Sequence, residues 1–271
     1  QFYTFFLLIT LFTTKGMGQP KERIFYSSFS PQDWDIFISK DSGKSLLKFT
    51  EHPSLDYDAV ISPDGKWVVF TSERTGIPKL YVKAIAGNQP PTLLIKSTSF
   101  QDQAAFSPDG SQLAFVASHE GNAEIYLIPF LTDSLQNIST ARNLTNHKGG
   151  DFRPSFSPDG TQIAFSSDRD HKIVPHPRFP FARQRIGDIF SVNTNGNNLK
   201  RLTDSDAWDG SPIWSADGSK IMFYSGRLGN PSIFEMNTDG TDQKQRFQFS
   251  GPAVSPKLIA ENKIAFTTWN N

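Results

Sequence analysis

Cysteine is absent from this chain of 271 residues, which excludes disulfides, thiolate metal sites, cysteine nucleophiles and a lipid-modified N-terminal cysteine. An excess of either charge is absent too, because 27 Lys and Arg residues balance 27 Asp and Glu residues. Proteins that bind nucleic acid need a basic excess or stripe to neutralise phosphates. The composition therefore argues against a nucleic-acid partner.

The chain also lacks an apolar run that would span a bilayer comfortably, because the apolar stretch at residues 2–12 is too short. Small residues follow it at 16 and 18, as in the cleavage region of a secretory signal, while the initiator Met and basic segment are missing. We therefore expect residues 1–19 to be a signal peptide remnant, and the mature protein to be periplasmic or secreted without stable membrane insertion. An N-terminal membrane anchor is the alternative.

The chain does contain a short sequence motif that occurs four times. Ser-Pro-Asp-Gly stands at 62–65, 107–110 and 157–160, and the variant Ser-Ala-Asp-Gly stands at 215–218. Proline fixes φ at the first corner of a turn, Asp can cap its own backbone, and Gly takes the positive φ that closes a hairpin. We interpret the motif as structural. Its intervals of 45, 50 and 58 residues indicate propeller blades.

Each repeat contains four short segments that we expect to form strands, called a, b, c and d from the axis outward. Strand a runs into the Ser-Pro-Asp-Gly turn, and strand b leaves it at 67–70, 113–116, 163–166 and 221–224. Strand c starts with Ile or Leu and an aromatic residue, and strand d ends in Leu or Phe, often before Thr. This apolar density suits strands packed between neighbouring sheets. The expected fold is all-β, a β-propeller of four-stranded blades over residues 20–271.

Counting these segments predicts six blades, the last of them incomplete. Strand b occurs six times, whereas strands a, c and d occur five times each. A closed ring of four-stranded blades would need three more strands. Because an open ring would expose unpaired strand edges, we expect the native protein to continue past residue 271.

Between residues 144 and 190 the chain reads Leu-Thr, Phe-Ser-Pro-Asp-Gly, Ile-Ala-Phe-Ser-Ser-Asp-Arg and Asp-Ile-Phe in succession. This string resembles the WD40-like β-propeller repeats of the TolB-like family. The resemblance covers about residues 22–269. It implies a TolB-like propeller at the cell envelope.

The loops that join strand b to c and strand d to a share one face of a propeller, and every histidine falls in such a loop. The histidines are His52, His119, His147, His171 and His176. Three carboxylates share one position at the start of strand a and a fourth lies one residue away: Asp56, Asp151, Asp209 and Asp102. We expect them to ring the channel mouth, where they could bind a divalent cation, position a sugar or act as acid and base. Alternatively, they cap the loops.

The loop at 168–187 departs from the repeat, because it is much longer than the corresponding loops of the other blades. It is basic, rich in proline, and contains Arg178, Phe179, Arg183 and Arg185. A stiff, cationic, aromatic loop suits an anionic ligand, such as an acidic polysaccharide or an acidic protein surface. The alternative is a loop that folds over the propeller, with its arginines in ordinary ion pairs.

The sequence shows no nucleophile signature, phosphate loop or zinc motif. We therefore expect a non-enzymatic, exported module that binds a protein or glycan at the cell envelope, without a cofactor unless a cation occupies the channel mouth. Two enzymatic alternatives stay open: a lyase similar to oligogalacturonate lyases, and the accessory propeller of a larger prolyl-oligopeptidase-type hydrolase. The expected ligand-binding residues are Asp56, Asp102, Asp151, Asp209, His52, His147, His171, His176, Arg178, Phe179, Arg183 and Arg185.

Overall fold

The computed structural model describes residues 10–12, 23–29, 34–39, 46–169, 173–175, 183–247, 253–260 and 263–268. The regular elements in these ranges are β-strands, apart from one 3-10 turn at Ile138–Thr140. In them, no helix is long and apolar enough to cross a membrane. The strands form antiparallel four-stranded sheets with neighbours in chain order, which confirms the predicted all-β propeller of four-stranded blades.

The sheets contain the following strands, each given from the axis outward. The first sheet holds β1 (Thr10–Phe12), β2 (Arg23–Phe29), β3 (Trp34–Ser39) and β4 (Leu46–Lys48). The second holds β5 (Asp56–Ile61), β6 (Trp67–Ser72), β7 (Lys79–Ala84) and β8 (Thr92–Leu93). The third holds β10 (Gln101–Phe106), β11 (Gln112–Ala117), β12 (Glu124–Pro129) and β14 (Arg142–Asn143).

The fourth sheet holds β15 (Asp151–Phe156), β16 (Gln162–Ser167), β19 (Asp188–Asn193) and β20 (Lys200–Arg201). The fifth holds β21 (Asp209–Trp214), β22 (Lys220–Ser225), β23 (Ser232–Asn237) and β24 (Lys244–Gln245), and β25 (Ala253–Ala260) pairs with β26 (Lys263–Thr268). Two pairs lie outside these blades: β9 (Ile95–Lys96) runs parallel to β13 (Gln136–Asn137), and β17 (Ile173–Pro175) pairs antiparallel with β18 (Arg183–Arg185).

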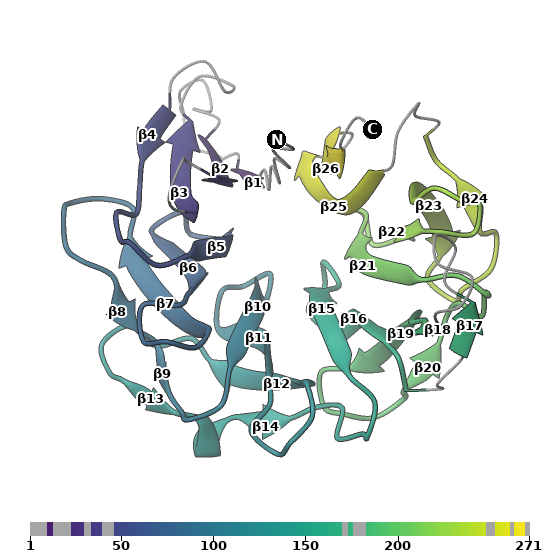
Figure 1. Ribbon diagram of the computed structural model, residues 1–271, viewed down its shortest axis with the longest axis horizontal. Coiled ribbons are helices and arrows are strands. Elements are labelled where there is room, and N and C mark those ends of the chain that lie inside the picture. The colour runs from purple at the N-terminus through teal and green to yellow at the C-terminus, as the bar shows by residue number, and fades with distance from the viewer. Residues whose placement is uncertain are drawn as a thin grey trace.

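The sheets are arranged around a common centre, with β5, β10, β15 and β21 innermost (Figure 1). The first strand, β1, contacts β25, so the two ends of the described chain adjoin. β1 pairs with β2 and lies inside the segment expected to be a signal remnant. That segment, the number of blades and an extension beyond residue 271 all stay predictions.

The core lies between the blades, where the second strands are almost entirely buried. Phe70, Phe115, Phe165 and Phe223 have no exposed surface. Each contacts an aromatic side chain on the third strand of its own sheet, with ring centroids 5.9–6.2 Å apart. Both faces of each second strand are covered, which explains why these segments are nearly continuous in apolar residues.

The recurring Leu-Thr at the end of the fourth segment joins the outer part of a blade to its third strand. Thr203 Oγ1 accepts a hydrogen bond from the Ile189 amide at 2.9 Å and donates one to Asp188 at 3.3 Å. Equivalent bonds are made by Thr50 and Thr145, each with an Ile amide and an acidic side chain. The repeated Thr therefore has a structural cause.

The Ser-Pro-Asp-Gly turns contact one another around the axis. Each glycine has a φ of 70–73°. A Cβ atom on Gly110 would lie 3.3 Å from Pro63 Cδ of the preceding blade, and the same relation joins Gly160 to Pro108 and Gly218 to Pro158 at 3.5 and 3.6 Å. The turn is thus also a contact between blades.

Candidate functional site

The three aspartates at the start of strand a lie inside the blades. Asp151 has no exposed surface, and both of its carboxylate oxygens accept from Arg169 Nη2, at 3.0 and 2.9 Å. Asp56 pairs in the same way with Arg74 at 3.1 and 3.0 Å, and Asp209 pairs with Arg227 at 2.8 Å. None of these three aspartates lines either of the pockets described below.

Each of these arginines is held by its own blade. Arg169 Nε donates to Ser167 Oγ at 2.9 Å, and its guanidinium lies over the rings of Phe165 and Phe190 at 5.3 and 4.9 Å. Arg74 and Arg227 make the same contacts in their blades. A charge buried in this way is neutralised by its partner and supported by the rings. The pairs are therefore part of the packing of the blade.

The third sheet replaces this pair with neutral groups. Gln101 stands at the aspartate position, Ala117 at the serine position and His119 at the arginine position. Gln101 is buried and bonds outside its own sheet, to the Leu80 amide of β7 at 3.3 Å and to the Ile95 carbonyl of β9 at 3.2 Å.

Asp102, the fourth carboxylate that the sequence singled out, lies beside this replacement. It accepts hydrogen bonds from Thr71 Oγ1 and the Gln103 amide, both at 2.7 Å. Burial raises the pKa of Asp102 to about 6, and the negative charge of Asp58 adds to the shift.

Two of the three described histidines, His52 and His147, bond to their own loops. His52 Nδ1 accepts from the Ser54 amide at 3.1 Å, and His147 Nδ1 accepts from the Gly149 amide at 3.0 Å. The His119 ring meets the edge of Tyr126 with centroids 6.4 Å apart. Across the described ranges, no three His, Asp or Glu side chains come together in a group that could hold a metal ion.

The remaining expected ligand residues belong to the loop at 168–187. His171, His176, Arg178 and Phe179 lie outside the described residues. Arg183 and Arg185 are the ends of β18, whose backbone pairs with β17. A ligand role for this loop stays a prediction.

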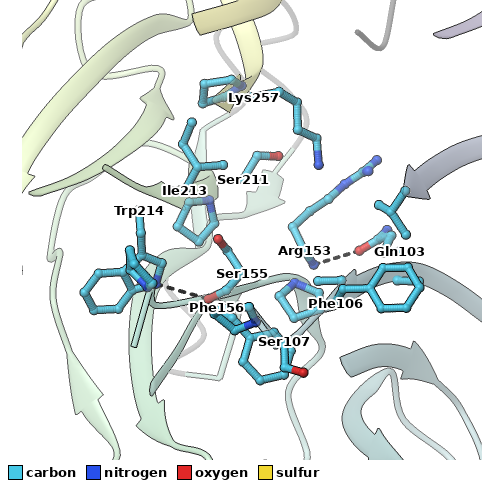
Figure 2. Close-up of a pocket in the computed structure, with 18 of the residues that line it drawn as sticks. Gln103, Phe106, Ser107, Arg153, Ser155, Phe156, Ser211, Ile213, Trp214 and Lys257 are labelled. Carbon is cyan, nitrogen blue, oxygen red and sulfur yellow. Dashed lines mark hydrogen bonds between the residues drawn. The ribbon is translucent and has the colours of Figure 1, made fainter. Parts of the chain in front are cut away.

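The structure instead forms a pocket of about 420 Å³ on the axis, on the side of the Ser-Pro-Asp-Gly turns (Figure 2). Pro63, Pro108 and Pro158 line its rim, while Phe156 and Trp214 are among its apolar walls. The Trp214 indole is fixed by a hydrogen bond from Nε1 to the Ser155 carbonyl at 3.1 Å. A concave, largely apolar site with a few polar groups is typical of ligand binding.

A β-bulge in each of five inner strands aims one side chain into this channel. The strand register shifts at the same place in β5, β10, β15, β21 and β25. At each shift one non-glycine residue has a φ of 49–55°, a conformation that side chains other than glycine rarely adopt. These bulge residues are Asp58, Gln103, Arg153, Ser211 and Ser255. Such strain is often found at functional positions, and here it recurs in five inner strands.

The bulge residues contact one another across the axis. Arg153 Nη1 pairs with Asp58 Oδ2 at 2.8 Å, and the Arg153 amide donates to Gln103 Oε1 at 2.8 Å. The Lys257 side chain points toward the Arg153 guanidinium (Figure 2). Burial, followed by the positive charge of Arg153, lowers the pKa of Lys257 below the usual lysine value.

A second pocket of about 310 Å³ lies at the other end of the channel and shares four bulge residues with the first, but not Asp58. Phe152, Trp208 and Tyr224 line it. Gly210 permits this arrangement, because a Cβ atom there would lie 2.7 Å from Trp208 Nε1 and from Tyr224 Oη. This aromatic pocket is on the face that carries the histidines.

Sequence reasoning missed both the bulge residues and the arginine partners. Ser-x-Arg recurs at 72–74, 167–169 and 225–227, and this spacing was the available signal for the buried pairs. The bulge position holds Asp, Gln, Arg or Ser, and the position before it varies as well, so no sequence signal marked the channel residues.

Comparisons with a family model, with curated proteins and with solved structures all find similarity to TolB-type proteins. The TolB beta propeller domain family matches residues 94–173. The Tol-Pal system protein TolB of Bordetella pertussis is 30% identical over 160 residues, which are 59% of this chain and 32% of that protein. A protein TolB homolog of Chlorobium luteolum is 27% identical over 179 residues, 66% of this chain and 36% of its own length.

The structure of a putative TolB from Agrobacterium tumefaciens superimposes with a TM-score of 0.69 at 23% identity, covering 83% of this chain and 74% of that one. The chain spans about a third of the length of the two curated relatives. The likeness therefore concerns the propeller.

Proposed function

The chain carries a TolB-like β-propeller, and from this premise we propose that it is a non-enzymatic protein-binding module of the cell envelope. The observation that carries the proposal is the pocket at the Ser-Pro-Asp-Gly face. Side chains from five inner strands converge on it, and the residue at the bulge of each strand has a strained backbone conformation. Its apolar walls and polar floor suit a side chain or segment of a partner protein. We place the module in the periplasm or outside the cell, as the signal-like N-terminus predicts.

Site-specific photo-crosslinking in the native cell tests this proposal. A photoreactive residue at Ala216, which is exposed and lines the pocket, is expected to capture an envelope protein. Ala86 is the matched control, because it is also exposed but lies in the turn after β7, away from the pocket. Equal capture from both positions, or none from Ala216, contradicts the proposal.

A glycan ligand is the second candidate, and the aromatic pocket at the histidine face favours it. Phe152, Trp208 and Tyr224 offer ring faces beside the Arg153 and Gln103 side chains, a combination suited to a sugar ring. The basic loop of the same face would attract acidic sugars.

The measurement is titration with an acidic oligosaccharide. Trp208→Ala is expected to weaken binding about tenfold, equivalent to about 1.4 kcal/mol. Replacing Arg178, Arg183 and Arg185 together by Ala should weaken it most at low salt, where charges are screened least. Unchanged binding in both variants would contradict the glycan proposal, and a protein would then be the one proposed ligand.

The enzymatic alternatives make a different prediction. A lyase similar to oligogalacturonate lyases would cleave acidic oligosaccharides in the presence of a divalent cation, and the accessory propeller of a prolyl-oligopeptidase-type hydrolase would require a catalytic domain in the same protein. Product analysis after incubation with oligogalacturonate and Mn²⁺ tests the first, and the complete coding sequence tests the second.

A further inference from the structure

The floor of the pocket at the Ser-Pro-Asp-Gly face carries an excess of positive charge. Arg153 and Lys257 are its two cations, and Asp58 is the one carboxylate among the lining residues. Asp58 is paired with Arg153 at 2.8 Å. Within the described part of the chain, the Lys257 ammonium makes no ion pair or hydrogen bond. It is half-buried and faces a second cation (Figure 2).

Two facing cations in a partly desolvated site are favourable only when an anion lies between or beside them. Asp58 attracts both cations but is paired with Arg153, and Asp102 attracts Arg153 while it accepts hydrogen bonds from Thr71 and the Gln103 amide. Among the described residues, neither carboxylate forms an ion pair with Lys257. An anionic group of a ligand would give Lys257 the direct ion-pair partner that the described residues do not provide. It would also reach the guanidinium of Arg153.

The walls above this floor define the rest of the ligand. Phe106, Phe156, Ile213 and Trp214 are apolar, and the proline rim continues the apolar surface to the mouth. Polar groups are interspersed among them, including the side chains of Ser155, Ser211 and Gln103. An alkyl chain could not use these donors and acceptors, whereas the amides of a peptide backbone could.

We propose that this pocket binds the free C-terminal carboxylate of a partner protein whose last residues are apolar. The carboxylate lies at Lys257 and Arg153, and the apolar side chains fill the space below the proline rim. The inference rests on the proposed protein-binding function and specifies how the partner is recognised.

The test is titration calorimetry of the full chain at low ionic strength with a pair of acetylated hexapeptides, Ser-Gly-Ala-Leu-Phe-Leu with a free carboxylate and the same peptide with a C-terminal amide. The free acid is expected to bind about 10- to 100-fold more tightly, the range for a charge-assisted hydrogen bond. Lys257→Met should remove this preference, and Lys257→Arg should restore most of it. Lys244→Met, on exposed strand β24, is the control that removes the same charge and should change nothing.

Equal binding of acid and amide, no binding of either at about 1 mM, or a preference that survives in a folded Lys257→Met variant would overturn the inference. Decanoate is the third ligand, and tighter binding of decanoate than of the peptide acid would also overturn it in favour of a fatty acid. If the peptide test fails but Ala216 still captures an envelope protein, the proposed protein-binding function stands without the carboxylate inference. If the crosslinking fails as well, both are rejected.

Discussion

The junction between the first two strands of a blade is packed in two different ways in this molecule. The second, fourth and fifth sheets close the junction between their first two strands with a buried Asp–Arg pair, as Asp151 and Arg169 do at 2.9 Å. The third sheet uses the neutral Gln101 with Ala117 and His119. The fold therefore does not need the ion pair. A blade that has one, however, depends on both partners, because either charge alone is costly to bury.

The largest effect is expected from breaking one pair. Asp151→Asn leaves the Arg169 guanidinium, whose side chain is 5% exposed, without a carboxylate. The free energy of unfolding should fall by about 3–5 kcal/mol, measured by urea denaturation. A loss below about 1 kcal/mol would mean that the rings of Phe165 and Phe190 hold the cation unaided.

Converting the whole junction to the third-sheet type should cost less than the single change. In Asp151→Gln, Ser167→Ala, Arg169→His, no unpaired charge is left, so the expected loss is about 1–2 kcal/mol. Urea denaturation of both variants compares their free energies of unfolding. If the triple variant is less stable than Asp151→Asn, the neutral junction depends on the partners that Gln101 finds outside its own sheet, the Leu80 amide of β7 and the Ile95 carbonyl of β9.

A smaller effect should distinguish the third sheet by its pH dependence. Only in this sheet does a carboxylate, Asp102, follow the junction residue; the corresponding residues are Tyr57, Phe152, Gly210 and Val254. Its native pKa of about 6 lies above the usual 3.8. The native state therefore binds more protons between these values, and the carboxylate destabilises the fold increasingly as the pH rises from about 4 to 6.

The check compares wild type with Asp102→Asn at pH 5 and pH 7. The variant is expected to gain about 1 kcal/mol relative to wild type over this interval, in keeping with a group whose pKa is raised by burial. Thr71→Val, which removes a hydrogen bond to the same carboxylate at 2.7 Å, serves as the control and should raise the pKa of Asp102 further. An unchanged difference between the two pH values contradicts the shift.

The sequence predicts the blades well because each blade is specified locally. The Ser-Pro-Asp-Gly turns and the Ile-aromatic starts of the third strands recur at every described blade position from β5 to β23 with small variations. Pairing between consecutive strands then follows from short connections. The confirmed part of the prediction is therefore the part that neighbouring residues determine.

The candidate site could not be predicted in the same way, because bulges decide where its side chains point. In a regular strand, Asp151 and Arg153 would lie on one face, since side chains alternate. The register shift between Phe152 and Ser155 separates them. Asp151 then pairs inside the blade with Arg169, and Arg153 reaches the axis. Neither the shift nor the partner can be placed from strand alternation alone.

The contact between successive Ser-Pro-Asp-Gly turns has a consequence for how repeats could be added to such a chain. Each repeat carries both halves of the contact, a proline for the unit that follows and a glycine for the unit before, as Pro108 and Gly110 show. A duplicated segment would therefore fit at any point without a new interface. The series ends consistently: the fourth turn has Ala216 in place of proline, and the segment between β25 and β26 has no glycine to receive one. Both halves of the contact are therefore absent from the same junction.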